Sequence, residues 1–296
     1  MGGWIAALDM GGTFVKGCVF DREIAPVTDF VSSPVNSQGG REEILDTVGD
    51  LLGRLCGGRE ISAVSISTPG PFDYRRGEAK MTAKYGGIYA VPLRPALRSR
   101  AGLREDIPVE FLSDANAFLL GEYFCGAGRG HETLAAITLG TGCGYSVMRG
   151  GRVLTNENGR PWDVPAMDAC EGDTLDNVCS GRGLSLRYER ITGEKKSAKQ
   201  MAEDQDAVSL RLFEEMGALL GRHLRPRLER LGVPLLVVGG QVSRALPLFE
   251  KSLSAALPGV EIAAAHRPAD AALFGAVAYG MGCAKPWEVY ADEKSR

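Results

Sequence analysis

The fold is decided by the stretch Ile5-Ala-Ala-Leu-Asp-Met-Gly-Gly-Thr13, which runs directly into Phe14-Val-Lys-Gly-Cys-Val-Phe20. The first run is apolar until it meets an acid, two glycines and a threonine, and the second run alternates. This pattern predicts a β-hairpin whose turn has so few side chains that its N–H groups can approach an anion. An ordinary tight hairpin also explains the glycines, because short glycine motifs have many false positives. The stretch alone leaves both interpretations open.

Asp9 stands at the mouth of this turn, where its carboxylate would repel a bare phosphate. A hydrated Mg²⁺ between the two removes the conflict, because Mg²⁺ keeps several water ligands and bridges carboxylates to phosphates. If the turn binds a nucleotide, we expect Asp9 to bind Mg²⁺ through water.

A second stretch repeats this plan. Thr133–Leu139 is an apolar run that stops at Gly140-Thr-Gly142, and the alternating run Tyr145–Arg149 follows. This turn has no acid, as expected of one that supplies hydrogen-bond donors rather than holding a metal. Two such turns that face each other could grip a polyphosphate from both sides, so the pair favours nucleotide binding over a plain turn.

The composition is that of an ordinary globular chain of 296 residues, with 44% hydrophobic and 24% charged residues. The net charge of -3 and the lack of a long basic run argue against a nucleic-acid partner, and no apolar run is as long as a membrane span. No leader pattern is visible, and the seven cysteines form no Cys-x-x-Cys pair. We therefore expect a cytoplasmic protein with reduced thiols.

Between the two turns, the chain alternates strands and helices. A strand is expected at Val27–Val31, then a helix whose apolar face runs from Ile44 to Leu55, then a strand at Ile61–Ser67. The helix would return the last strand parallel to the first, as in half of a ribonuclease H-like domain. Residues 73–106 are irregular apart from a helix near 93–100, and they are either a lid or substrate loop or a plain surface excursion.

Several further elements are expected. Residues 150–205 look irregular, and a long helix over Asp206–Leu231 should be kinked or ended near Pro226. The remaining expected elements are strands at 108–112, 234–238 and 260–263 and helices through 118–124, from 242 and over 270–280.

The ordered motifs of this chain resemble those of ROK-family sugar kinases, members of the actin/hexokinase-like superfamily. The matching motifs are Leu8–Thr13, Thr68–Gly70, Asp114–Ala117 with Gly121-Glu122, Leu139–Gly142, Val237–Gly240 and Ala272–Ala276. The resemblance implies an α/β fold of two ribonuclease H-like (actin-like ATPase) domains with a cleft between them, and a homodimer. We place the lobes at 1–113 and 114–281, with a C-terminal helix over 282–296 that packs back on the first lobe.

The resemblance also implies roles for individual residues. Asp114 would be the general base that accepts the proton of a sugar hydroxyl, although Asp is also a common helix N-cap. Gly239 and Gly240 would let adenosine lie against bare backbone, or they form a simple strand-to-helix turn. The residues expected to bind ATP and Mg²⁺ are Asp9, Gly11, Gly12, Thr13, Lys16, Gly140, Thr141, Gly142, Gly239 and Gly240.

The expected sugar site departs from the family pattern. Arg160, in Glu157-Asn-Gly-Arg160, stands where typical members have His, while Asp176 replaces a Glu and Ser113 replaces an Asn. Arg160 could read a carboxylate, phosphate or acetamido oxygen on the sugar. It could equally pair with Asp163, Glu171 or Asp173 and touch no substrate. We take Ser113, Glu157, Arg160 and Asp176 as the candidate substrate-binding residues.

The zinc-binding cysteine cluster of typical members is also replaced. The chain has Asp168-Ala-Cys170-Glu-Gly-Asp173 at this place, and two isolated cysteines cannot build a tetrahedral cysteine-rich site. We predict no structural zinc.

The leading hypothesis is thus an ATP- and Mg²⁺-dependent kinase acting on a hydroxyl of a hexose or hexose derivative. The alternative is a non-catalytic sugar or nucleotide sensor on the same fold, against which the retained Asp9 and Asp114 argue. A Rossmann dehydrogenase is excluded because no Gly-x-Gly-x-x-Gly follows the first strand.

Overall fold

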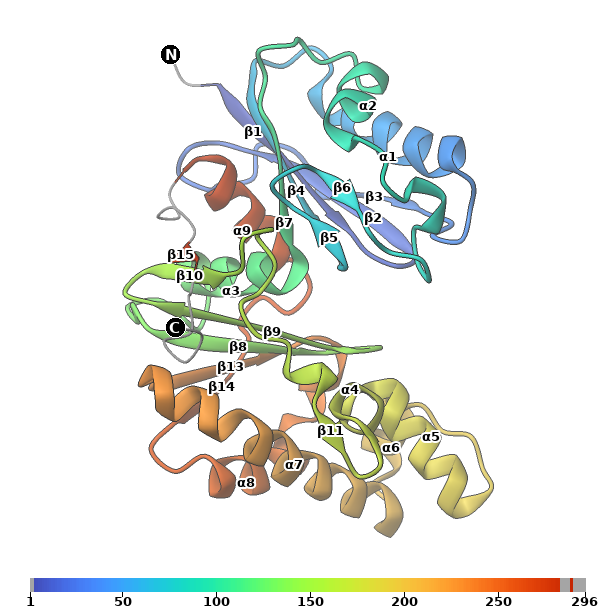
Figure 1. Ribbon diagram of the computed structural model, residues 1–296, viewed down its shortest axis with the longest axis vertical. Helices are drawn as coiled ribbons and strands as arrows, with labels where there is room; N and C mark the ends of the chain where they lie inside the picture. The colour runs from blue at the N-terminus through green and yellow to red at the C-terminus, as the bar shows by residue number, and fades with distance from the viewer. Residues whose placement is uncertain (1–2, 283–287, 290–296) are drawn as a thin grey trace. The chain divides into compact units, whose positions relative to one another are not determined.

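The computed structural model describes residues 3–282 and 288–289. The chain divides into two compact units, each described by itself below (Figure 1). Unit 1 comprises residues 1–124, 152–162 and 270–296, and unit 2 comprises residues 125–151 and 163–269. The helix that begins at Asp114 and the helix over 271–280 fall in unit 1, whereas we expected them in the C-terminal lobe. The division into evolutionary lobes stays a prediction.

Unit 1 is built on a five-stranded sheet in the order β3-β2-β1-β4-β7. Its sheet strands are β1 (Trp4–Met10), β2 (Phe14–Phe20), β3 (Val31–Pro34), β4 (Ile61–Thr68) and β7 (Val109–Ser113). Its helices are α1 (Arg41–Cys56), η1 (Gly86–Ile88), α2 (Leu93–Arg100), α3 (Asp114–Cys125) and α9 (Ala271–Gly280), and its short strands are β5 (Phe72–Asp73), β6 (Glu78–Ala79), β10 (Arg152–Thr155) and β15 (Glu288–Val289). β1 pairs antiparallel with β2 and parallel with β4, which confirms the predicted hairpin and crossover.

The two faces of β1 bury different helices because successive side chains of a strand point to opposite faces. Ala6, Leu8 and Met10 belong to the apolar cluster that includes the buried face of α1. On the other face α9 packs against β1 and β4, where Gly280 lies beside Ile5. The sheet of unit 1 is therefore covered on both sides (Figure 1).

Unit 2 holds four neighbouring sheet strands in the order β14-β13-β8-β9. These strands are β8 (Leu134–Leu139), β9 (Cys143–Arg149), β13 (Leu235–Gly239) and β14 (Glu261–Ala264). Its other elements are η2 (Pro165–Met167), β11 (Ala169–Cys170), β12 (Asp173–Thr174), α4 (Leu175–Cys179), α5 (Gly181–Thr192), α6 (Ala198–Asp204), α7 (Ala207–Leu231), η3 (Gln241–Ala245) and α8 (Leu246–Ala256). α7 and α8 pack closely because Gly217 leaves room for the backbone of Phe249.

Two predicted boundaries are wrong for local reasons. The third strand occupies Val31–Pro34 instead of Val27–Val31, because the Thr28 hydroxyl accepts a hydrogen bond from the Val19 amide. α7 does not end at Pro226 but continues to Leu231, while the alternative of a kink stays a prediction. Pro226 lies on an exposed face, where water can satisfy the carbonyl that the ring leaves unpaired.

Residues 150–205 are more regular than predicted, since they contain β10 and the short helices α4, α5 and α6. Hydroxyl N-caps begin these helices at Thr174, Ser180 and Ser197. α4 and α6 are too short for apolar periodicity to reveal them, so their capping residues were the usable signal. α5 has 12 residues and buries Leu184 and Tyr188 one turn apart, so its apolar spacing was a signal in addition to its cap at Ser180.

The C-terminal helix expected over 282–296 falls largely outside the described residues. Glu288–Val289, which are described, form the short strand β15 and pair with β10 instead. The expectation of a helix is wrong at these two positions.

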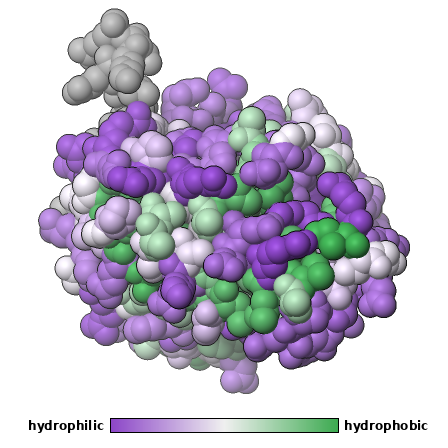
Figure 2. Space-filling view, turned by 90° about the horizontal axis from the view of Figure 1, so that it is seen from below, coloured by the Kyte–Doolittle hydropathy of each residue, from purple (hydrophilic) through white to green (hydrophobic). Residues whose placement is uncertain are grey.

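Hydrophilic residues cover most of the face seen in Figure 2, with apolar groups between them. Across the described ranges 3–282 and 288–289, no helix combines the length and apolarity that a membrane crossing requires.

Candidate active site

The carboxyl ends of three neighbouring parallel strands bring polar residues to one edge of the sheet in unit 1. Asp9 of β1 lies opposite Ser67 of β4, and Thr68 of β4 lies opposite Ser113 of β7. Asp114 follows Ser113 directly as the first residue of α3. Strand register thus gathers two predicted carboxylates that are about a hundred residues apart in sequence.

Asp9 is held in place by its neighbours. The Ser67 hydroxyl donates to Oδ1 of Asp9 at 2.9 Å, and Lys16 lies opposite Asp9 in the β1–β2 register. Burial raises the pKa of the Asp9 carboxyl, while the Ser67 hydrogen bond and the charge of Lys16 oppose this rise. A bound cation would favour the ionised carboxylate in the same way as Lys16.

The first glycine turn joins β1 to β2 as predicted. The Gly11 amide donates to the Phe14 carbonyl at 2.9 Å, and the hydroxyl of the buried Tyr85 donates to the Gly11 carbonyl at 2.5 Å. A Cβ added to Gly12 would lie 3.2 Å from Nζ of Lys84. The turn therefore has a fixed backbone and a lysine amine beside it.

Asp114 combines solvent access with a raised pKa. Its Oδ1 accepts hydrogen bonds from the Ala115 amide at 2.8 Å and from the Ser113 hydroxyl at 3.4 Å. Asp114 is exposed, yet the neighbouring protein atoms reduce the hydration of its carboxylate and raise its pKa to about 6. The charge of Asp9 adds to the rise, while Lys84 and the two hydrogen bonds oppose it. A carboxyl group of this kind is suited to accept a proton near neutral pH.

A second loop of unit 1 carries Arg160 and Glu157. The Asn156 side chain orders this loop by accepting hydrogen bonds from the amides of Asn158 and Arg160. Arg160 donates from Nε to the Phe72 carbonyl at 2.9 Å, whereas Glu157 is exposed and accepts from the side chain of Asn158.

Tyr74 links this loop to the edge of the sheet. Its amide donates to the Asn158 carbonyl at 2.9 Å, and its hydroxyl donates to the Thr68 carbonyl at 3.1 Å. Burial raises the pKa of the Tyr74 hydroxyl, with the negative charge of Asp114 adding to the rise and Arg160 opposing it. Tyr74 thus lies within the electrostatic reach of both Asp114 and Arg160.

In unit 2 the structure brings together the second glycine turn and Gly239–Gly240. β8 and β13 are adjacent parallel strands, with Gly239 opposite Thr138. Gly240 has φ of +83°, and a Cβ there would lie 2.5 Å from the Leu139 carbonyl oxygen, so only glycine fits this close approach. The Gly181 amide, at the start of α5, donates to the Gly140 carbonyl at 2.8 Å.

Asp176 holds the second turn. Its Oδ1 accepts from the Cys143 amide at 2.6 Å, and its Oδ2 pairs with Arg182 at 2.7 Å. Asp176 was expected to contact a sugar, and that role stays a prediction. In this structure its carboxylate fixes the backbone that follows Gly142.

A cavity of about 750 Å³ opens beside this turn within unit 2. Gly140 and Thr141 line it, together with the cationic residues Arg182, Lys199 and Arg244 and one acid, Glu203, which pairs with Lys199 at 3.7 Å. Hydrogen-bond donors and positive charges around one hollow are the chemistry that binds phosphate groups.

The segment that replaces the family's cysteine cluster is tied to α7 by ion pairs. Arg227 binds Asp163 at 2.6 Å and Asp168 at 2.9 Å, and Nδ1 of His223 lies 3.2 Å from Asp168. In the part of the chain that the structure describes, no group of three or more His, Cys, Asp or Glu side chains is arranged to hold a metal. The absence of structural zinc stays a prediction.

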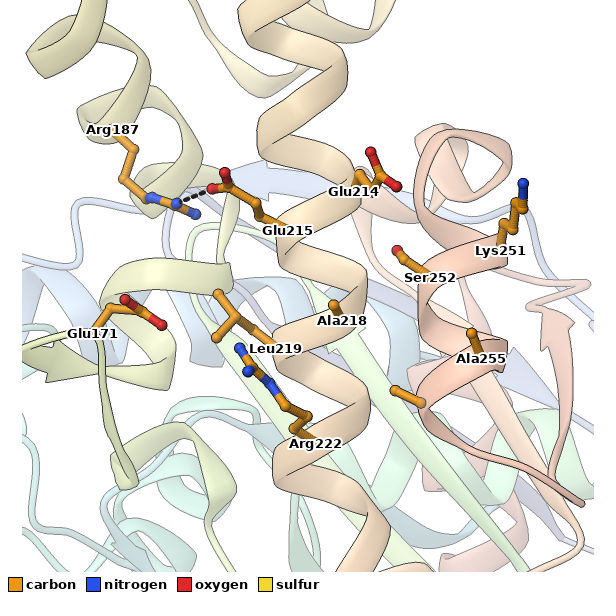
Figure 3. Close-up of a pocket in the computed structure, with 11 residues that line it drawn as sticks. Glu171, Arg187, Glu214, Glu215, Ala218, Leu219, Arg222, Lys251, Ser252 and Ala255 are labelled. Atoms are coloured by element: carbon orange, nitrogen blue, oxygen red, sulfur yellow. Dashed lines mark hydrogen bonds and ion pairs between the residues drawn. The ribbon is translucent and has the colours of Figure 1, made fainter.

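A separate pocket of about 710 Å³ lies between α7 and α8 in unit 2 (Figure 3). Its charges are of both signs, and Arg187 and Glu215 pair with each other at 2.5 Å. None of the predicted site residues lines this pocket, so we do not assign it to the active site.

Sequence reasoning missed several residues around the turns: Ser67, Tyr74, Lys84, Tyr85, Asn156, Arg182, Lys199 and Arg244. Ser67 could have been found, because it ends the strand that was predicted to return parallel to the first strand, and Asp9 lies near the end of that first strand. Lys84 and Tyr85 lie in the segment interpreted as a lid or a surface excursion. No hydrophobic periodicity in this segment points to them.

Comparisons with known proteins find similar chains. The family model described as "ROK family" matches residues 5–279. Glucokinase from Thermotoga maritima is 28% identical over 309 residues, covering 92% of this chain and 95% of the relative. N-acetyl-D-glucosamine kinase from Haemophilus influenzae is 27% identical over 279 residues, covering 85% and 88%.

A solved structure is also similar. The crystal structure of a ROK family glucokinase from Streptomyces griseus in complex with glucose and AMPPNP has a TM-score of 0.77 at 25% identity, covering 94% of this chain and 99% of that chain. These likenesses confirm the resemblance and the actin-like α/β fold class expected from the sequence.

Proposed function

The chain belongs to the ROK family, and on that premise we propose that it is a sugar kinase that transfers the γ-phosphoryl group of ATP to a hydroxyl of a hexose or hexose derivative. Its relatives include proteins named glucokinase and N-acetyl-D-glucosamine kinase, and a related structure holds glucose and an ATP analogue. The proposal extends this reaction class to the present chain.

The observation that carries the proposal is the pair of carboxylates at one edge of the unit 1 sheet. Asp114 has a pKa of about 6 and remains accessible to solvent, so it can take the hydroxyl proton as the new O–P bond forms. Asp9 contributes to this raised pKa, which places the two groups in one electrostatic environment. We assign them different roles because Asp9 lies near the end of β1 beside the glycine turn, whereas Asp114 begins a helix.

Asp9 is suited to hold Mg²⁺. It is a hard oxygen donor whose Oδ1 is oriented by Ser67, and Mg²⁺ is usually held by one or two carboxylates plus substrate phosphates rather than by an all-protein cage. When bound there, Mg²⁺ would neutralise charge on the phosphates. Lys84 would add positive charge beside the first turn.

The second turn and its cavity supply the binding half of the proposal. The bare backbone at Gly140 and Gly240 and the cations Arg182, Lys199 and Arg244 would receive the nucleotide within unit 2. Since phosphoryl transfer depends mainly on positioning and charge stabilisation, these groups would orient ATP, and Asp114 would act on the sugar.

A coupled assay of ADP release tests the proposal. The protein should release ADP only when ATP, Mg²⁺ and a sugar are all present, over a panel of hexoses, N-acetylhexosamines and acidic sugars. Mass spectrometry of the sugar should show one added phosphoryl group. Sugar-independent ADP release would contradict the assigned reaction.

The alternative is the non-catalytic sensor. It predicts that sugars and nucleotides bind, as measured by calorimetry, while no sugar in the panel is phosphorylated. That result would remove the catalytic roles of Asp9 and Asp114 and leave only a binding function.

A further inference from the structure

Arg160 is a fixed guanidinium inside unit 1. Its Nε donates to the Phe72 carbonyl, its amide donates to the Asn156 side chain, and its side chain is half-buried. Gly159 packs its backbone on Tyr74, where an added Cβ would lie 3.2 Å from that side chain. The arginine is therefore held in one orientation before any ligand arrives, which lowers the entropy lost on binding.

The charge of Arg160 has no carboxylate counterpart in its own unit. Among the residues of unit 1 whose side chains the structure describes, no acid forms an ion pair with it. Asp73, next in sequence to Phe72, accepts from the Arg76 amide at 2.9 Å, and Glu157 accepts from Asn158. Two of the three acids that we considered as partners have other contacts in unit 2, since Asp163 pairs with Arg227 and Asp173 accepts from Asn177.

Arg94 shows what a fully engaged arginine looks like in the same unit. It is also half-buried, and its three nitrogens bind the carbonyls of Val109, Arg75 and Tyr74. It pairs in addition with Glu110 at 3.1 Å. Arg160 has one such carbonyl and no acid within the described part of unit 1, so its two terminal nitrogens keep their donors for a ligand.

The charged residues around Arg160 determine which chemical group the ligand must have. A half-buried guanidinium favours an anionic oxygen pair, which it can bind through two parallel hydrogen bonds. Asp9 and Asp114 would repel an anionic sugar, so such a sugar needs a cation nearby to be accepted. Arg160 is a second cation beside Lys84 in this region, because Tyr74 joins its loop to the sheet edge: the Tyr74 amide donates to the Asn158 carbonyl, and its hydroxyl donates to the carbonyl of Thr68, which lies opposite Ser113.

We propose that Arg160 selects an acidic sugar, whose carboxylate or phosphate group binds the terminal nitrogens of Arg160 while a separate hydroxyl is presented to Asp114. This inference rests on the proposed kinase function and names its substrate class. The reaction itself is unchanged: the hydroxyl oxygen forms the bond to the γ-phosphorus, ADP leaves, and Asp114 takes the proton.

The first test compares matched acceptors with the unaltered protein, so it depends on no variant. Glucuronate and glucose differ in one carboxylate, and glucose 6-phosphate carries a phosphate at the same carbon. We expect kcat/KM for one of the two acidic sugars to exceed that for glucose by about 10- to 100-fold, as for one charge-assisted hydrogen-bonded contact. The two acidic arms distinguish a carboxylate site from a phosphate site.

The second test uses variants of the loop. Arg160→Gln should raise KM for the acidic sugar by about 10- to 100-fold and leave kcat/KM for glucose within about threefold, and Arg160→Lys should restore part of the loss. Arg152→Gln removes an exposed arginine from the same segment and should change neither value. Calorimetry with the acidic sugar and a non-hydrolysable ATP analogue should show the same loss of affinity for Arg160→Gln.

The outcomes separate this inference from the proposed function. Phosphorylation of neutral or N-acetylated sugars with no preference for acidic ones overturns the role of Arg160 and leaves the kinase standing. A lowered melting temperature for Arg160→Gln with unchanged sugar selectivity also overturns it, because Arg160 would then be a structural residue. No ADP release with any sugar overturns the kinase proposal, and the substrate class with it.

Discussion

Each of the two glycine turns joins a pair of antiparallel strands, but different residues surround and contact them. The first turn lies beside Asp9 and near Asp114, with Tyr85 bound to its backbone and Lys84 at its edge. The second turn is fixed by backbone contacts from Gly181 and Gly240 and borders a cavity with three cations. We therefore expect the two turns to have different tasks, set by the side chains around each turn.

The difference teaches that a carboxylate near a turn has no fixed role. Asp114 is accessible and has a raised pKa, whereas both oxygens of Asp176 are engaged by the Cys143 amide and Arg182. We therefore expect Asp114 to act in the chemistry and Asp176 to act through the backbone of the second turn.

Replacing each carboxylate by its amide tests this difference with the largest expected effect. Asp114→Asn should lower kcat by about 10²- to 10⁴-fold, because an amide cannot accept the hydroxyl proton, while ATP affinity stays within about threefold. Steady-state kinetics and calorimetry with ATP measure the two effects. Near-normal turnover would remove Asp114 from the role of base.

Asp176→Asn is the matched substitution at the second turn. It removes the ion pair with Arg182 and weakens the bond from Cys143, so it should lower the free energy of unfolding by about 1 kcal/mol and raise KM for ATP about fivefold. We expect kcat to stay within about threefold. A raised KM for the sugar alone would instead support the sugar contact that the sequence predicts for Asp176.

We expect the cations near the two turns to affect different kinetic parameters. Lys84 lies beside Gly12 and acts on Asp114, so Lys84→Gln should lower kcat by about 10- to 100-fold through lost stabilisation of the transferring group. Lys199 lines the cavity of unit 2, and Lys199→Gln should raise KM for ATP about threefold with kcat unchanged. The same change in both parameters for both variants would show that the turns do not divide these tasks.

The pH profile sharpens the role assigned to the first turn. The pKa of Asp114 is about 6 and the base must be ionised, so kcat/KM should fall about tenfold per pH unit below that value. Asp9 raises this pKa and Lys84 lowers it, so Asp9→Asn should move the acidic limb to lower pH and Lys84→Gln to higher pH. Rate measurements across pH 4.5 to about 8 would show both shifts.

The contribution of Asp114 to the free energy of unfolding should change with pH in the opposite direction to the activity. A carboxyl whose pKa is raised by folding binds more protons in the folded than in the unfolded state, so its contribution falls as pH rises from about 4 to about 6. Asp114→Asn should remove this dependence in urea unfolding curves. An unchanged curve would mean that the pKa of Asp114 is not raised by folding.

The sequence predicted the parts that local patterns encode. Alternation and glycines predicted the hairpin over residues 4–20, and one apolar face predicted α1. Parallel pairing then follows from the crossover, and it brings Asp9 and Asp114 to one edge. The roles of these two residues came from the family resemblance and stay predictions.

Contacts between distant residues had no local signal. The Tyr85 hydroxyl reaches Gly11 across 74 residues, and Arg160 reaches Phe72 across 88. A sequence pattern reports the period of one element but not which side chain closes a turn from another. For this reason the cations and buried hydroxyls around the turns emerged only in the structure.

Adding a methyl group to each turn should give the smallest effect, a change in stability. It compares directly the residues that contact the two turns. A Cβ at Gly142 would lie 2.8 Å from Oδ1 of Asp176 and displace the carboxylate from the Cys143 amide, so Gly142→Ala should cost about 1 to 2 kcal/mol of stability. A Cβ at Gly12 meets only the flexible end of Lys84 at 3.2 Å, so Gly12→Ala should cost less than about 0.5 kcal/mol. Urea unfolding measures both values. Equal losses would mean that Asp176 is not what holds the second turn, since the only difference expected between the two substitutions is the carboxylate that one of them displaces.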